Sequence, residues 1–179
     1  AAVAVGAYFT ATKVIIPEKN YKAAIASYDS GDYETAIEYF KNHLDYKESV
    51  NYLSKCRYQS ALEKVSEGNI SVATDEMSYV PNNCTDLWSE FNYQVAVEYE
   101  KEDNLQEALD FYKKISGYKD SSDKVAELEQ QIAEEAVKSA YEAGQTAMNT
   151  QEYDKAIQFF TKAGDYSDAP DQILEAKYQ

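Results

Sequence analysis

The residue types that most often do chemistry are scarce in this chain of 179 residues, which has one histidine and two cysteines. A single histidine, His43, with no nucleophile near it in the sequence does not make a catalytic base, and its place at an expected helix end suits a charge–dipole role. Cys56 and Cys84 lack metal-ligand spacing and are too few for a disulfide framework. A buried thiol at Cys56 and a Cys56–Cys84 bridge in an exported protein are the two alternatives.

Acidic residues are numerous, but their arrangement does not predict a reaction. Pairs such as Glu134 and Glu135 fall in an amphipathic stretch and are typical of solvated surface. The Asp-Ser-Gly-Asp segment at 29–32 offers oxygen ligands but lacks the twelve-residue calcium pattern with its distal glutamate. The sequence also has no Gly-rich phosphate loop, no nucleophile elbow and no His-Glu-x-x-His motif. We therefore expect no catalytic residue, no metal and no cofactor, and predict that the protein is not an enzyme.

Aromatic side chains offer recognition rather than catalysis. There are 17 tyrosines, and most recur at fixed repeat positions, where packing explains them. Protein interfaces favour tyrosine and tryptophan, so the tyrosines that the repeat does not require are candidate partner-binding residues: Tyr39, Tyr52, Tyr79 and Tyr99. Core packing is the alternative for each of them, and it is the favoured interpretation for Trp88 and Phe91.

The formal net charge of −15 narrows the classes of partner. A strongly negative surface repels the phosphates of nucleic acids, which we therefore exclude as partners, and it repels anionic lipid headgroups. The same field attracts basic peptides and basic protein patches. Solubility alone is the other explanation of the charge.

The elements that position these residues repeat along the chain. One sequence motif occurs at 31–37 (Gly-Asp-Tyr-Glu-Thr-Ala-Ile), 104–109 and 152–157, with a weaker copy at 68–73. Similar motifs at intervals of a few tens of residues indicate stacked repeat units. Aligning the tyrosines that open each copy (Tyr21, Tyr58, Tyr93 and Tyr141) divides the chain into units near 21–57, 58–92, 93–140 and 141–179.

Each unit is predicted to be a pair of helices. In the first unit these run from Tyr21 to Ser30 and from about Tyr33 to His43, with Gly31 taking a positive φ at the helix end between them. A small residue recurs where the two helices must cross closely, namely Ala36, Ala73, Ala108 and Ala156. The near-helical spacing of apolar residues from 122 to 148 predicts one uninterrupted helix there.

The connectors between units are a second repeated motif, at 45–49 (Asp-Tyr-Lys-Glu-Ser), 117–121 and 165–169. Their acidic residues are expected to accept hydrogen bonds from backbone amides in the first turn of the next helix. Their tyrosines are expected to lie in the seam between neighbouring units, with the hydroxyl at the edge.

The N-terminal segment, residues 1–17, is apolar and ends at Pro17. It is shorter than the ~20 apolar residues of a complete membrane span. We interpret it as the remnant of a membrane anchor; the end of an uncleaved signal anchor and a short helix packed on the first repeat are the alternatives.

These motifs resemble the tetratricopeptide-like (TPR-like) repeats of bacterial envelope proteins, over about residues 18–179. The Trp-x-x-Leu-Gly opening of the consensus repeat is absent and the 122–148 helix is longer than usual, so the chain is a divergent relative. The resemblance implies an all-α solenoid of about four helix pairs, a right-handed superhelix whose concave face binds extended peptides or proteins. We therefore expect an interaction scaffold for basic or extended segments on the extracytoplasmic side of a bacterial membrane, with the cytoplasm as the alternative location. A stalk or spacer without a ligand is the alternative function.

Overall fold

A computed structural model describes residues 16–179, and within this range it contains nine helices and no strand. The all-α fold class is thus confirmed. The helices are α2 (Ile16–Asp29), α3 (Tyr33–Lys41), α4 (Ser49–Ser66), α5 (Ile70–Met77), α6 (Thr85–Lys101), α7 (Leu105–Lys113), α8 (Ser121–Asn149), α9 (Tyr153–Ala163) and α10 (Ala169–Tyr178). The predicted helix pair of the first unit corresponds to α2 and α3, and the predicted long helix to α8.

The chain folds as two compact units, one ending at Glu102 and the other spanning Asp103–Gln179. The first contains helices α2 to α6 and the second contains α7 to α10. The finer division into four units and the right-handed superhelix remain predictions.

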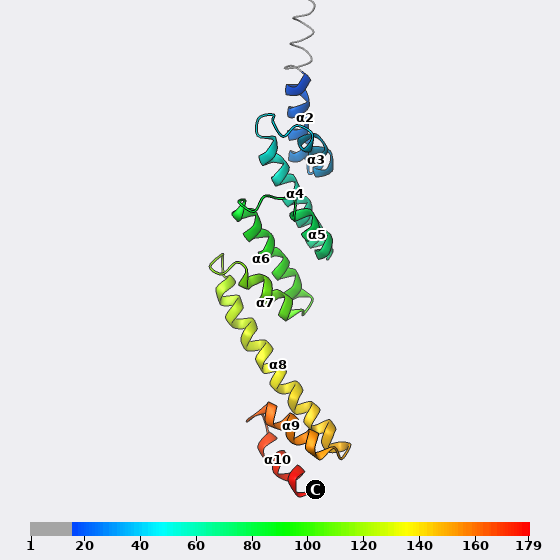
Figure 1. The fold of residues 1–179 in the computed structure, drawn as a ribbon, viewed down its shortest axis with the longest axis vertical. Coiled ribbons are helices and arrows are strands. Elements are labelled where there is room, and N and C mark those ends of the chain that lie inside the picture. Colours follow the sequence, from blue (N-terminus) through cyan, green and yellow to red (C-terminus); the bar gives the residue numbers. More distant parts are fainter. Residues whose placement is uncertain (1–15) are drawn as a thin grey trace, which may run out of the picture. The chain divides into compact units, whose positions relative to one another are not determined.

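In the first unit α2 packs on α3, α3 packs on α4, and α4 packs on both α5 and α6 (Figure 1). The core beneath α2, α3 and α4 is formed by Tyr21, Ala24, Ala36, Phe40 and Cys56. Ala36 is fully buried, so its methyl side chain lets the helices approach closely. The equivalent alanines Ala73, Ala108 and Ala156 are also fully buried, as the sequence predicts.

In the second unit the 29-residue helix α8 is the central element. It packs against α7 and α9, and α9 packs against α10 (Figure 1). The crossing of α8 and α9 is tight at Gly144, where a Cβ atom would stand 2.7 Å from ring carbons of Phe160. Glycine at this point lets the two helices meet around a buried aromatic ring.

The turn that joins the two helices of a pair has the same backbone conformation between α2 and α3 in the first unit and between α8 and α9 in the second. The Asp32 amide donates to the Ser27 carbonyl at 2.9 Å, and the Glu152 amide donates to the Ala147 carbonyl at 2.8 Å. These bonds close a helix end through a residue with positive φ. That residue is Gly31 (φ +83°), as predicted, whereas Gln151 holds the same place at φ +59° without being a glycine.

The connectors that precede α4, α8 and α10 also share one conformation. The residue after the tyrosine has a positive φ in each: 46° at Lys47, 49° at Lys119 and 54° at Ser167. Two positions later a small residue is fully buried, namely Ser49, Ser121 and Ala169. The Ser49 hydroxyl donates to the Tyr46 carbonyl at 2.6 Å, so a polar side chain is accommodated without an unsatisfied group.

The capping expectation for these connectors is wrong. Glu48, Asp120 and Asp168 occupy the N-cap positions, but none of their side chains makes a capping hydrogen bond. Asp168 instead accepts from the hydroxyl of Tyr141 and, at 3.0 Å, from the side-chain amide of Gln172. One oxygen of this carboxylate is thus engaged by Tyr141 of α8 and the other by Gln172 of α10, and neither caps a backbone amide of the first turn.

Two of the connector tyrosines, Tyr46 and Tyr166, pack on the opening tyrosine of their own unit, and a place in the seam with the next unit stays a prediction. The rings of Tyr46 and Tyr21 meet edge to face with centroids 5.4 Å apart, and Tyr166 meets Tyr141 at the same distance. The Tyr46 hydroxyl donates to Glu18 at 2.9 Å. The connector therefore ties back to the first helix of its own pair.

Candidate protein-binding grooves

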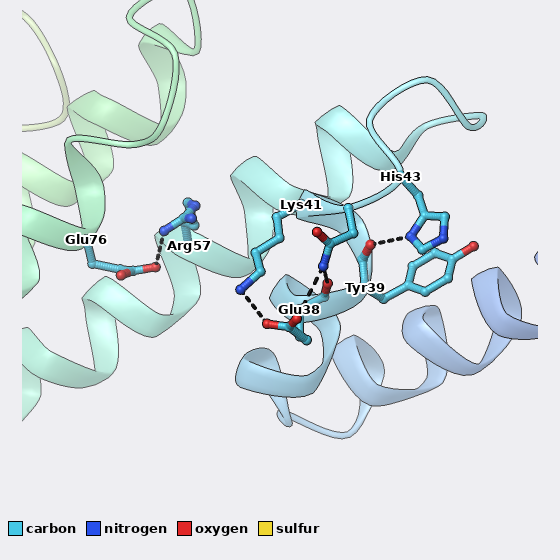
Figure 2. Close-up of polar contacts among 7 residues, drawn as sticks. Glu38, Tyr39, Lys41, His43, Arg57 and Glu76 are labelled. Carbon is cyan, nitrogen blue, oxygen red and sulfur yellow. Dashed lines mark hydrogen bonds and ion pairs between the residues drawn. The ribbon is translucent and has the colours of Figure 1, made fainter.

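Two of the four predicted partner-binding tyrosines lie half-buried in an aromatic cluster around Tyr21. The Tyr39 ring stacks on His43 with centroids 4.2 Å apart (Figure 2). The Tyr39 hydroxyl donates to the Pro17 carbonyl at 3.2 Å. The Tyr52 ring stacks on Phe40 at 5.2 Å. Both rings therefore contribute to packing, and any contact with a partner would use only their exposed edges.

The other two candidates lie farther along the first unit. Tyr79 follows α5 and is 66% exposed, whereas Tyr99 is a half-buried residue of α6. The core interpretation of Phe91 is confirmed, because this residue is buried and meets the half-buried Trp88 edge to face at 6.2 Å. A partner-binding role for the four tyrosines stays a prediction.

The chain's only arginine, Arg57, joins α4 to the end of α5. Its Nη1 atom lies 2.9 Å from Oε1 of Glu76, and the two side chains are only 15% and 25% exposed (Figure 2). The guanidinium carbon also lies 4.4 Å from the ring centroid of Tyr79. Because water screens this partly buried pair incompletely, its attraction is stronger than that of a surface ion pair. No motif or spacing in the sequence marks Arg57 and Glu76 as a pair.

A hollow of about 510 Å³ opens beside this ion pair, between the start of α3 and the helices α4 and α5. We call it the first groove. It is lined by Gly31, Asp32, Tyr33, Glu34, Ile37, Arg57, Ser60, Glu63, Lys64 and Glu76. Tyr33 and Ile37 are half-buried and pack against the core beneath, so they form an apolar floor.

The charges around this floor favour a cationic ligand. Both cations of the lining already have carboxylate partners: Arg57 pairs with Glu76, and Lys64 pairs with Glu67 at 3.0 Å. Glu34 and Glu63 are exposed, and their carboxylates have no ion-pair or hydrogen-bond partner among the described residues. The unneutralised charge at the rim is therefore negative.

The two cysteines are both free thiols rather than a bridge. Cys56 is completely buried, and this burial raises the pKa of its thiol to about 11. Cys84 is half-buried. In the described range, no group of three or more histidine, cysteine, aspartate or glutamate side chains is placed to hold a metal ion.

A larger hollow of about 580 Å³ lies on the surface of the second unit. Apart from Tyr166, its lining comes from α8 alone: Gln130, Gln131, Ala133, Glu134, Glu135, Val137 and Lys138. A single helix forms nearly all of its wall, so this hollow is an open helix surface rather than a groove between elements.

One stretch of the second unit matches a known protein family. Residues 137–166 match the family model of the tetratricopeptide repeat. This match and the paired helices of the fold support a TPR-like repeat protein. The matched residues comprise the second half of α8, the whole of α9 and the connector up to Tyr166. No match was found among curated proteins.

The first unit contains the same arrangement as the matched repeat. The edge-to-face pair of Tyr141 and Phe160, with centroids 5.6 Å apart, has its counterpart in Tyr21 and Phe40 at 5.9 Å. TPR repeats generally mediate protein–protein interaction or scaffolding. Among the described helices, none is both long enough and apolar enough to cross a membrane.

Proposed function

We propose that this protein is a non-enzymatic scaffold that binds protein segments in which an apolar side chain stands next to a lysine or arginine. The observation that carries the proposal is the first groove, where an apolar floor of Tyr33 and Ile37 lies beside the unpaired carboxylates of Glu34 and Glu63. The family match supports the general class of function.

Each part of such a segment has a counterpart in the groove. An apolar side chain laid on Tyr33 and Ile37 would remove apolar surface from water, and this gains about 25 cal/mol per Å² before the cost of ordering the segment. A neighbouring ammonium or guanidinium would approach Glu34. The net charge of −15 would speed the encounter with a basic segment at low salt.

Fluorescence anisotropy of the full chain with a labelled octapeptide of alternating lysine and leucine tests this proposal. We expect saturable binding that weakens at high salt and in the variant Glu34→Lys. A peptide of alternating glutamate and leucine should not bind. The matched control is Glu107→Lys, because Glu107 is an exposed carboxylate in the first turn of α7 and does not line the first groove.

Equal weakening by Glu34→Lys and Glu107→Lys would mean that the peptide responds to the overall charge and would contradict groove binding. Absence of saturable binding at either salt concentration would favour the alternative function, a spacer.

One observation favours the spacer. Helix α8 has 29 residues, which corresponds to about 44 Å. The exposed side chains of Gln130, Glu134 and Lys138 mark a stretch of α8 that is not packed on its neighbours. A spacer requires length and stiffness but no ligand, so variants of both units that leave folding intact would then leave the protein's role in the cell intact.

We also propose that the chain acts on the extracytoplasmic side of a bacterial membrane, anchored through residues 1–17. Only the apolar sequence of that segment supports this placement, and residues 1–15 lie outside the described part of the chain. Fusing residues 1–17 to a soluble reporter tests it: recovery of the reporter in the membrane fraction supports anchoring, and its recovery in the soluble fraction contradicts it.

A further inference from the structure

The second unit contains a hollow of about 600 Å³ between the start of α9 and the end of α10, which we call the second groove. It is lined by Gln151, Glu152, Tyr153, Asp154, Lys155, Ile157, Ala176, Lys177 and Gln179. Tyr153 and Ile157 are half-buried and pack against the core of this unit. The second groove thus has an apolar floor of the same composition as the first.

Five lining residues of the first groove have counterparts of the same chemical type in the second at a constant offset along the chain. The pairs are Asp32 and Glu152, Tyr33 and Tyr153, Glu34 and Asp154, Ile37 and Ile157, and Arg57 and Lys177. One position between the floor residues matches as well, because Ala36 and Ala156 are both fully buried, whereas Thr35 is replaced by Lys155. The same backbone turn therefore presents the same tyrosine, isoleucine and carboxylate in each unit.

In both grooves the carboxylate beside the apolar floor is free to bind a cationic ligand. Glu152 is paired with Lys155, whose Nζ atom lies 2.8 Å from its Oε1 atom. Asp154, like Glu34, is exposed and has no ion-pair or hydrogen-bond partner within the described residues. In a bound segment, a lysine or arginine next to the apolar side chain would meet Glu34 in the first groove and Asp154 in the second.

The cation opposite this carboxylate differs between the grooves. In the first, Arg57 is neutralised by Glu76 and packed against the ring of Tyr79. In the second, Lys177 is exposed and has no ion-pair partner among the described residues. An unpaired ammonium at the rim repels a cationic ligand, so the second groove should bind the same segment more weakly.

From this correspondence we propose that the second groove is a second docking site for the same class of ligand, so that one chain binds two segments that each carry an apolar and a basic side chain. This inference rests on the proposed function. It predicts two sites of unequal affinity, with the first groove the tighter.

Nitrogen-15 NMR of the full chain, titrated with the lysine–leucine octapeptide, observes both grooves separately. We expect two sets of shifted amides, one over residues 31–37 and one over 151–157, with the second set saturating at higher peptide concentration. Glu34→Lys should weaken the first set by about tenfold and leave the second unchanged, and Asp154→Lys should do the reverse. Lys177→Gln should tighten the second set by about two- to fivefold.

The outcomes separate the two proposals. Shifts confined to residues 31–37 would overturn the second site and leave the proposed function standing. A second set that Asp154→Lys does not weaken would also overturn it, because the carboxylate would then have no role. Absence of shifts in both segments would overturn the proposed function itself, and the inference with it. The unperturbed amides in each spectrum report directly that every variant is folded.

Discussion

The α8–α9 crossing gives the sharpest test of the packing, through the substitution Gly144→Ala. Alanine in a helix interior is favoured over glycine by about 1 kcal/mol, so propensity alone predicts a more stable protein. The added Cβ, however, would stand 2.7 Å from ring carbons of Phe160, whereas carbon atoms in contact are normally about 3.5–4.0 Å apart. Phe160 is fully buried, so its ring cannot move aside without disturbing the core.

Overpacking costs about 1–3 kcal/mol, and a contact of 2.7 Å with a fully buried ring belongs in the upper part of this range, about 2–3 kcal/mol. We therefore expect Gly144→Ala to lower the free energy of unfolding by about 1–2 kcal/mol after the gain in helix propensity. Urea denaturation followed by circular dichroism measures the change as a lower midpoint at an unchanged slope. Ser139→Ala is the control, since this exposed α8 position takes the propensity gain without a new contact. A Gly144→Ala protein as stable as the parent would refute the tight crossing.

Three further predictions concern other parts of the chain. Ala108→Leu should lower the free energy of unfolding by about 1–3 kcal/mol in the same assay, because the side chain of Ala108 is fully buried where helices cross; an unchanged midpoint would contradict this role. Iodoacetamide should modify the half-buried Cys84 first and reach Cys56 only on unfolding, because burial raises the pKa of the Cys56 thiol to about 11. Mass spectrometry of timed samples shows the order of modification. Equal rates at the two cysteines would contradict the burial of Cys56. Lys47 lowers the pKa of Glu18 below its usual range, so the pair should stabilise the fold above the ordinary carboxyl pKa and lose this effect as the pH falls through the lowered pKa. The difference in free energy of unfolding between the parent and Glu18→Gln should therefore shrink over that pH interval. A difference independent of pH would exclude the linkage.

The parts of the fold that could be predicted from the sequence are those that a local pattern specifies. Apolar spacing gave α3 and α8 to within two residues, because one buried face of a helix needs a side chain every three or four positions, whereas α2 begins five residues before the predicted start at Tyr21. Gly31 marked a helix end through its positive φ. The burial of Ala36 and its counterparts followed from their recurrence where each pair must cross.

The candidate site was less predictable, because it depends on distances between helices. Arg57 meets Glu76 and Tyr79 only after α4 and α5 fold onto each other, and no spacing in the sequence specifies that contact. Asp168 stands at an N-cap position, but its side chain accepts a hydrogen bond from Tyr141 of α8 and makes no capping hydrogen bond. One signal could have identified the grooves: Tyr33 and Arg57 recur together as Tyr153 and Lys177 at the same offset.

Site-specific photo-cross-linking tests the central claim most directly, that the first groove holds a protein segment. A photoreactive amino acid replaces Ile37 in the groove or, as a control, the exposed Val72 of α5, which does not line it. The chain is irradiated in the source cells and the adducts are sequenced by mass spectrometry. We expect adducts from position 37 alone, joined to a segment with an apolar residue beside a lysine or arginine, and reduced by Glu34→Lys. Equal adducts from positions 37 and 72, or none from position 37, would contradict the claim.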